Sequence, residues 1–97
     1  MKIGYWAVFN YDEKDKIDYG ISIYFPDVSE AYTCASDDEN GKKMAKEVLE
    51  LATYDLNAKE LPKASDYDTL AKNLTENEKL YWIEYDTDEI QVIREFL

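Results

Sequence analysis

The sequence contains no histidine and a single cysteine, Cys34. Without histidine, the Ser-His-Asp and Cys-His arrangements of nucleophilic catalysis are excluded, and so is a histidine general base. A zinc site is disfavoured because its usual ligands are cysteine and histidine. No basic residue adjoins Cys34 in the sequence to favour a reactive thiolate. We therefore interpret Cys34 as a structural thiol within a strand and expect neither a cofactor nor a bound metal.

Basic residues are also scarce. The chain carries 11 lysines and arginines against 22 aspartates and glutamates, which gives a formal net charge of -11. A surface with this charge repels nucleic acids, whose phosphates are bound by lysine and arginine, and it repels anionic lipid headgroups. We expect a basic partner protein, with no direct nucleic-acid binding and no membrane association.

Long apolar runs are absent as well. No stretch approaches the roughly 18 to 20 apolar residues of a membrane-spanning helix, and the segment Met1–Trp6 lacks the pattern of a signal peptide. One cysteine cannot form an internal disulfide, so the fold does not depend on an oxidising compartment. These absences favour a cytoplasmic protein.

The residues that are present suffice for one hydrophobic core. Hydrophobic residues make up 45% and aromatic residues 14% of the 97 residues, well above the content of disordered chains. A chain of this length typically forms one domain. We therefore expect residues 1–97 to form a single domain.

Three strands are predicted in the first part of the chain. Residues Ile3–Phe9 are apolar on both faces, which indicates a strand covered on both sides. The charged segment 11–18 follows as a hairpin loop. Residues Tyr19–Phe25 alternate with period two until Pro26 ends the strand, and a third strand covers about residues 30–35. Short connections between these strands predict an antiparallel meander.

A long amphipathic helix is predicted next. Ser36–Glu39 has the S-x-x-E form of a capping box and places acids in the first helical turn. Small and apolar residues then recur at steps of three and four, while lysines and glutamates, Glu50 among them, lie mostly on the other side. The apolar stripe consists of Gly41, Ala45, Val48, Leu49, Ala52 and Leu56. We expect about 20 helical residues, ending near Asn57 in a left-handed cap.

The remaining segments complete an α+β fold. Residues 61–65 form a linker, Ser65 with Asp68 offers a second cap, and residues 70–74 suggest a short helix. Leu80–Asp86 is predicted as a fourth strand beside the first, and residues 90–97 fit a fifth strand better than a helical turn. The predicted fold is a three-stranded antiparallel meander plus one or more further strands. One long helix packs on one face, in the order β-β-β-α-β.

Several of these segments together resemble the HicB-like antitoxin family. The strand that ends in Phe25-Pro26-Asp27 is similar to the family's "fPD" turn, and Thr33 follows at the family's spacing. The helical run 45–51 resembles the A-x-E-x-L motif, residues 61–65 the LP-x-x-S linker, and residues 83–86 the V-x-D strand end. The resemblance covers about residues 3–86 and rests on the order and spacing of these elements together.

The resemblance implies a partial ribonuclease H-like fold without that enzyme's active site. It also implies an antitoxin, not an enzyme, that binds a small basic HicA-like ribonuclease toxin and masks the toxin's catalytic histidine. Many members of the family carry a C-terminal helix-turn-helix or ribbon-helix-helix domain that binds DNA. The residues that follow the last predicted strand are too few for such a domain, so the resemblance is to the N-terminal domain alone.

Carboxylates allow a competing interpretation. Acids clustered on a ribonuclease H-like sheet can hold Mg²⁺ and cleave phosphodiesters, and the candidates are Asp27, Asp86, Asp88 and Glu89. The first predicted strand, however, contains no acid between Ile3 and Phe9, where a two-metal nuclease needs one. The acidic segments 12–15 and 86–89 lack the ligand spacing of a calcium loop. We interpret them as solvated loops.

The aromatic residues indicate a protein interface. The chain contains nine tyrosines and two tryptophans, residue types that are enriched where proteins bind one another. Core packing accounts for more than half of them. A sheet with a helix on one face leaves its other face for a partner, with acids near its rim. The residues that we expect to contact the partner are Tyr5, Trp6, Asp15, Asp18, Tyr19, Tyr24, Asp27 and Tyr32.

The first hypothesis is therefore a HicB-like antitoxin, or a domain derived from one, that binds a basic toxin and forms a dimer or tetramer through unpaired sheet edges. The alternative is a standalone oligomeric protein-binding module, encoded by a phage or mobile element, without a toxin partner. A third hypothesis is the acid-dependent metal nuclease. The neighbouring open reading frame discriminates the first two, because only the antitoxin requires a short basic protein next to it.

Overall fold

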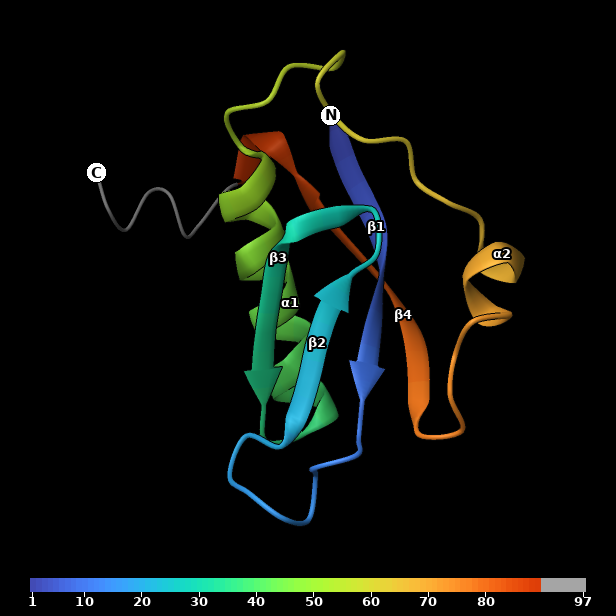
Figure 1. The fold of residues 1–97 in the computed structure, drawn as a ribbon. Helices are drawn as coiled ribbons and strands as arrows, with labels where there is room; N and C mark the ends of the chain where they lie inside the picture. Colours follow the sequence, from blue (N-terminus) through green and yellow to red (C-terminus); the bar gives the residue numbers. More distant parts are fainter. Residues whose placement is uncertain (90–97) are drawn as a thin grey trace.

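The computed structural model describes residues 1–89 of the chain, and it has the predicted β-β-β-α-β order (Figure 1). A four-stranded antiparallel sheet with the strand order β3-β2-β1-β4 packs against one main helix. The elements are β1 (Lys2–Asn10), β2 (Ile21–Phe25), β3 (Val28–Ala35), α1 (Asp38–Thr53), α2 (Tyr67–Ala71), β4 (Glu78–Asp86) and a 3₁₀ turn (Thr87–Glu89). The strand predicted for residues 90–97 lies outside the described residues.

Strand β1 lies in the centre of the sheet and has a partner on each side. It pairs with β4 over its whole length, from Lys2 opposite Asp86 to Asn10 opposite Glu78. On the other side, Val8 to Asn10 pair with β2. This arrangement confirms the prediction that the fourth strand lies beside the first. Charged loops and Pro26 separate the strands, because proline cannot donate to a sheet ladder.

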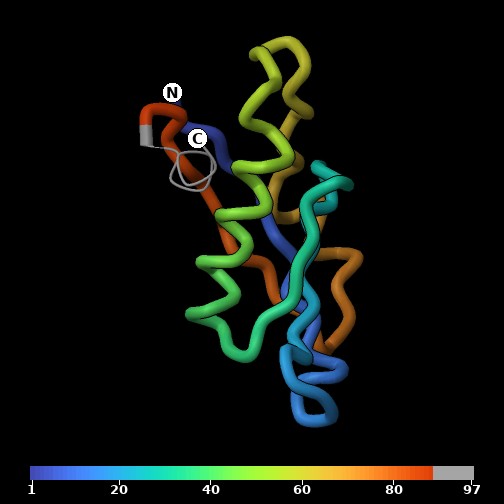
Figure 2. The backbone as a smooth tube through the Cα atoms, turned by 90° about the vertical axis from the view of Figure 1, so that its left-hand side faces the viewer, coloured from blue at the N-terminus to red at the C-terminus, as the bar shows by residue number. Residues whose placement is uncertain are grey.

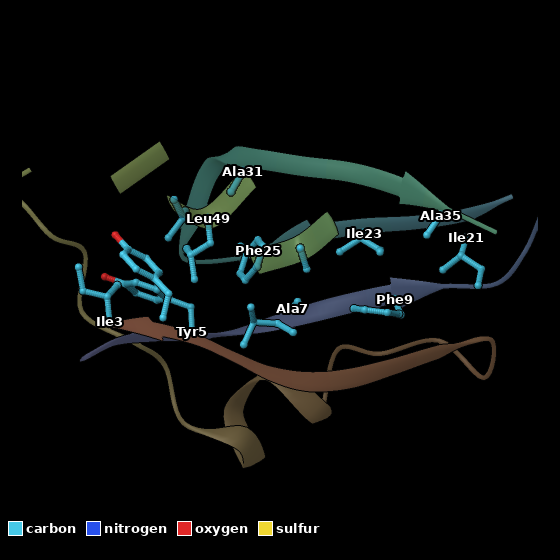
Figure 3. Packing of buried hydrophobic residues seen from close by; sticks show 14 residues of the cluster. Ile3, Tyr5, Ala7, Phe9, Ile21, Ile23, Phe25, Ala31, Ala35 and Leu49 are labelled. Carbon is cyan, nitrogen blue, oxygen red and sulfur yellow. The ribbon is translucent and has the colours of Figure 1, made fainter. Parts of the chain in front are cut away.

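Helix α1 covers one face of the sheet, and the segment that contains α2 lies on the other side. Figure 2 shows α1 on one side of the strands and residues 68–77 on the opposite side. The core side chains of β1, β2 and β3 point toward α1, where they meet Leu49 (Figure 3). Ala45 of α1 belongs to the same buried cluster. No helix within residues 1–89 has the length and apolar character needed to cross a membrane.

The start of α1 differs from the prediction. The N-cap is Asp37, whose side chain accepts a hydrogen bond of 2.7 Å from the Asn40 amide. Ser36 is an exposed residue before the cap, so the predicted capping box with Glu39 does not form. Aspartate and serine cap helices about equally well, so the residue type could not decide between two adjacent candidates.

The end and the buried side of α1 also require corrections. The helix ends at Thr53, four residues before Asn57, and its cap Tyr54 is right-handed. Glu50, which we expected on the solvent side, is buried together with Thr53. Thr53 shares a hydrogen bond with the Tyr85 hydroxyl of β4. Polar pairing of this kind is invisible to a search for apolar periodicity, because that search assigns glutamate and threonine to the surface.

Two shorter elements begin later than predicted. Strand β2 begins at Ile21, because Tyr19 adopts a left-handed backbone with φ 56° that no strand can contain. Helix α2 is capped by Asp66, whose side chain accepts from the Thr69 amide at 3.0 Å. The side chain of Thr69, followed by its amide, holds the pKa of Asp66 below its usual value. Ser65, the predicted cap, bonds elsewhere.

Candidate functional site

The face of the sheet turned away from α1 carries a continuous set of aromatic and apolar side chains. We call this the open face and define it by Trp6, Val8, Tyr24, Tyr32, Leu80 and Trp82. Strand register places these residues in rows, because paired residues of an antiparallel sheet point the same way. Tyr32 pairs with Tyr24, Tyr24 with Val8, and Val8 with Leu80, so one row crosses the four strands.

The aromatic side chains of the open face are unusually exposed for their size. Tyr32 keeps 71% of its surface exposed, Trp82 45% and Tyr24 42%. Burial and the nearby Glu78 carboxylate raise the pKa of Tyr24, so its hydroxyl remains a neutral hydrogen-bond donor at physiological pH. Val8 lies between Tyr24 and Leu80 in the row and is only 2% exposed, so the accessible part of the open face consists mainly of its aromatic side chains. Exposed apolar side chains gathered on one face are typical of an interaction site.

A ring cluster forms the second row of the open face. Trp6 pairs with Trp82 across the β1–β4 ladder, with ring centres 5.2 Å apart in an edge-to-face arrangement. Tyr67 from α2 makes a similar contact with Trp6 at 5.1 Å. The Trp82 ring packs directly against Gly4, where a Cβ atom would collide with it. Trp82 therefore lies flat against the sheet with its outer surface in solvent.

The structure brings some of the predicted partner-binding residues together and separates others. Trp6, Tyr24 and Tyr32 share the open face. Tyr5 does not, because it is only 3% exposed and lies under α1, where its hydroxyl donates to the Pro62 carbonyl oxygen. Burial, followed by the charge of Asp27, raises the pKa of Tyr5. Tyr5 is a core residue, and its inclusion in the interface was wrong.

The three predicted acids do not form one rim. Asp15 and Asp18 are exposed in the loop before β2, whereas Asp27 lies in the turn after β2, at the opposite end of that strand. Both Asp27 oxygens are engaged, since Oδ2 accepts from the Ser65 amide and Oδ1 from the Ser65 hydroxyl, each at 2.7 Å. Asp27 therefore anchors the linker between α1 and α2. Asp27 binds another part of the same chain and does not form a rim with Asp15 and Asp18.

The loop between β1 and β2 carries two further exposed side chains with large apolar surfaces. Ile17 is 60% exposed and Tyr19 is 59% exposed. Tyr19 is the one non-glycine residue with a positive φ in the part of the chain that the structure describes. This conformation costs about 1 to 2 kcal/mol for a residue with a Cβ atom. Tyr19 keeps this unfavourable backbone conformation although its exposed side chain buries little surface in the fold.

The acids considered for metal binding lie apart. Asp86 pairs with the N-terminal ammonium group at 3.5 Å and accepts from the Asp88 amide at 3.0 Å. The hydrogen bond from the Asp88 amide, together with the charge of the N-terminus, lowers the pKa of Asp86. Asp27 is committed to Ser65 at a different turn. Within residues 1–89, no group of three or more potential ligands is arranged to hold a metal ion. Cys34, expected within a strand, lies in β3 but is exposed.

Three residues of the open face, Val8, Leu80 and Trp82, were not among the predicted partner-binding residues. Tyr67, which contacts Trp6 from α2, was not among them either. Gly4 was the signal for Trp82, because an isolated glycine inside a strand often marks the close approach of another group. The pairing of β1 with β4 had already been predicted, so the ring above Gly4 could have been sought on that strand. Tyr67 had no comparable signal. It reaches Trp6 only because the Asp27–Ser65 anchor brings the linker across the sheet.

No protein-family model matches the sequence, and no curated protein matches it. The structure, in contrast, is similar to a chain of a solved complex. That complex is described as a "Toxin-Antitoxin complex from Streptococcus pneumoniae". The TM-score is 0.74 at 22% sequence identity, and the match covers 91% of this chain and 71% of that chain. The protein therefore shares its fold with a component of a toxin–antitoxin complex.

Proposed function

We propose that this chain is a HicB-like antitoxin that uses its open face to bind and neutralise a small basic HicA-like ribonuclease toxin. The observation that carries the proposal is the set of exposed aromatic side chains on the face opposite α1, where Tyr32 is 71%, Trp82 45% and Tyr24 42% exposed. Large aromatic side chains are the residues that most often dominate the energetics of protein interfaces. In this role the chain is a binding protein, not an enzyme.

The charge of the chain supports a basic partner. A net charge of -11 attracts a cationic protein over distances of about 8 to 10 Å at physiological salt and accelerates its association. A ribonuclease presents cationic groups to its substrate RNA, because phosphates are bound by lysine and arginine. An acidic protein with an aromatic surface competes with RNA for such a site. The shared fold with a component of a toxin–antitoxin complex and the sequence resemblance to HicB-like antitoxins support the same proposal.

The test begins with the open reading frame next to the gene of this chain, which we expect to encode a short basic protein. That product should arrest growth and cleave RNA when expressed alone, and co-expression of this chain should suppress both effects. Tyr32→Ala and Trp82→Ala should each weaken the complex by about 2 kcal/mol, the usual size of an interface hot spot. Isothermal titration calorimetry on the purified proteins measures that loss.

Tyr54→Ala is the matched control, because Tyr54 is an exposed tyrosine at the end of α1 and lies off the open face. It should leave affinity unchanged. The proposal is overturned if the neighbouring product is absent or fails to bind, or if Tyr54→Ala weakens binding as much as Tyr32→Ala. An oligomer of the purified chain with no such partner would favour the standalone module. Cleavage of RNA by the chain with Mg²⁺ alone would favour the nuclease.

A further inference from the structure

The loop between β1 and β2 is built as an ordered unit. The Lys14 amide donates to the Tyr11 carbonyl oxygen, and the amides of Lys16 and Ile17 donate to the Glu13 carbonyl oxygen, at 3.1 to 3.3 Å. Gly20 is buried against the Glu13 backbone, where a Cβ would collide with the Glu13 carbonyl group. The backbone at the end of the loop therefore packs against the backbone at its beginning.

Two exposed side chains of this loop, Ile17 and Tyr19, do not pack into the core of the fold. Ile17 and Tyr19 extend into solvent on either side of Asp18, and Tyr19 keeps its left-handed backbone. Strained residues persist where the surrounding structure imposes them, and they cluster at ligand-binding positions. A rigid loop also binds more tightly than a flexible one, because little conformational entropy is lost on association.

An open hollow of about 330 Å³ lies between these side chains. Its lining consists of Lys14, Ile17, Asp18, Tyr19, Gly20 and Ser36. Asp18 is the one carboxylate among the lining residues. The Lys14 ammonium group lies over the Tyr11 ring, 5.8 Å from its centre, and its charge acts on Asp38. The charged side chains of the hollow are therefore Asp18 and Lys14, and the Lys14 ammonium group faces the Tyr11 ring, which does not line the hollow. Ile17 supplies an aliphatic wall and Tyr19 an aromatic wall.

We propose that this hollow receives an arginine side chain of the basic partner protein. The guanidinium group pairs with the Asp18 carboxylate, while the aliphatic stem lies against Ile17 and the planar group contacts the Tyr19 ring. Arginine fits better than lysine because its planar group binds carboxylates through two parallel hydrogen bonds and stacks on aromatic rings. This inference rests on the proposed function for the identity of the partner, and it adds a second contact region beyond the open face.

The first experiment uses the purified complex with the product of the neighbouring open reading frame. Asp18→Asn and Tyr19→Asn should each raise the dissociation rate about tenfold, a loss within the range of a charged hydrogen bond. Asparagine at position 19 retains the left-handed backbone, so the loop keeps its shape and the melting temperature stays unchanged. Glu13→Gln is the matched control, because Glu13 is an exposed acid of the same loop outside the hollow. Its dissociation rate should equal that of the wild-type chain.

The second experiment does not require the partner. N-acetyl-L-arginine amide, titrated into the ¹⁵N-labelled chain, should shift the amide resonances of residues 17–20 with a dissociation constant on the order of 10 mM. N-acetyl-L-citrulline amide, which has the same shape without the charge, should not, and Asp18→Asn should abolish the shifts. Equal shifts with both compounds, or none with either, overturn the inference.

The two proposals fail in distinguishable ways. If the partner binds but Asp18→Asn and Tyr19→Asn dissociate at the wild-type rate, the arginine site is wrong and the proposed function stands. If the neighbouring product does not bind the wild-type chain, the proposed function fails. Specific shifts with the arginine compound would in that case still support the hollow as a binding site for a cationic side chain.

Discussion

The Tyr11 hydroxyl donates a hydrogen bond of 2.6 Å to Oδ1 of Asp38, across 27 positions in the sequence. The second carboxylate oxygen accepts from the Tyr81 hydroxyl at 3.0 Å. One side chain in the first turn of α1 therefore connects the end of β1 to β4. The Lys42 ammonium group lies 4.5 Å from the centre of the Tyr81 ring and adds a cation–π contact. Docking of α1 on the sheet depends in part on the ionised form of Asp38.

Asp38→Asn should therefore weaken the fold in a pH-dependent manner. The Tyr11 hydrogen bond is the main cause that lowers the pKa of Asp38 below its ordinary value of 3.8. Because the folded pKa is depressed, the stabilisation is present above about pH 4 and is lost as pH falls through the lower folded value. At pH 7 the substitution should reduce the free energy of unfolding by about 1 kcal/mol. Urea denaturation of both proteins at several pH values measures the difference.

The difference between the two proteins should shrink below pH 4, and a constant difference would contradict this assignment.

Tyr11→Phe provides a check on the alkaline side. Burial, followed by the bond to Asp38, raises the pKa of Tyr11. A raised tyrosine pKa stabilises the fold below the usual value of about 10, and this contribution is lost as pH rises above it. On the alkaline side, the wild-type chain should lose its advantage over Tyr11→Phe as the pH rises above about 10.

Gly41→Ala should destabilise the protein although alanine is the better helix former. A Cβ at position 41 would lie 2.7 Å from Cε2 of Phe9 and 3.0 Å from Cδ1 of Ile23. Alanine gains about 1 kcal/mol of helix propensity, but overpacking of a tight core costs about 1 to 3 kcal/mol. Thermal unfolding should therefore show a lower melting temperature. Adding Phe9→Leu should make the alanine substitution less harmful than in the wild-type background, and equal harm in both would exclude the clash.

Leu49→Ala and Leu51→Ala form a matched pair on one helix. Leu49 is buried in the core, whereas Leu51 is exposed on α1. Removing Leu49 leaves a cavity and should reduce the free energy of unfolding by about 2 to 5 kcal/mol. The same change at Leu51 should stay within about 0.5 kcal/mol, as surface substitutions usually do. Chemical denaturation checks both, and neither variant should change the dissociation rate of the partner under conditions where it is folded.

Exposed acids and open-face aromatics should affect binding kinetics differently. Replacing both Asp15 and Asp18 with asparagine should slow association and flatten its salt dependence, because exposed charges steer the encounter and are screened by salt. Any faster dissociation of this double variant is assigned to Asp18 and the hollow that it lines. Tyr24→Ala should instead speed dissociation, at a cost of about 2 kcal/mol. Surface plasmon resonance at two salt concentrations separates these effects. If Lys43 or Lys46 on α1 controlled dissociation instead, the partner would dock on the helix side.

Much of the fold could be predicted from sequence, because local patterns carry that information. Period-two alternation located β2, and the acidic cap with its apolar stripe located α1. The candidate site was harder, since β1 is apolar on both faces and its pattern does not tell which face meets the helix. Tyr5 and Trp6 were both assigned to the partner-binding surface for this reason, although neighbours in a strand point to opposite faces. The structure places Tyr5 in the core and Trp6 on the open face. Trp82 belongs to the site through its pairing with Trp6, which depends on contacts between residues distant in sequence.

The position of β1 between two partners has a consequence for how the chain acquires its structure. Its ladder with β4 joins residues at opposite ends of the described chain, Lys2 with Asp86. During synthesis β1 leaves the ribosome long before β4. The edge of β1 that pairs with β4 therefore stays unpaired until most of the chain has been made. Pairings of such large sequence separation are formed slowly, because loop closure precedes the contacts that compensate for it. A nascent chain that stalls before residue 78 would expose that strand to proteases and to aggregation.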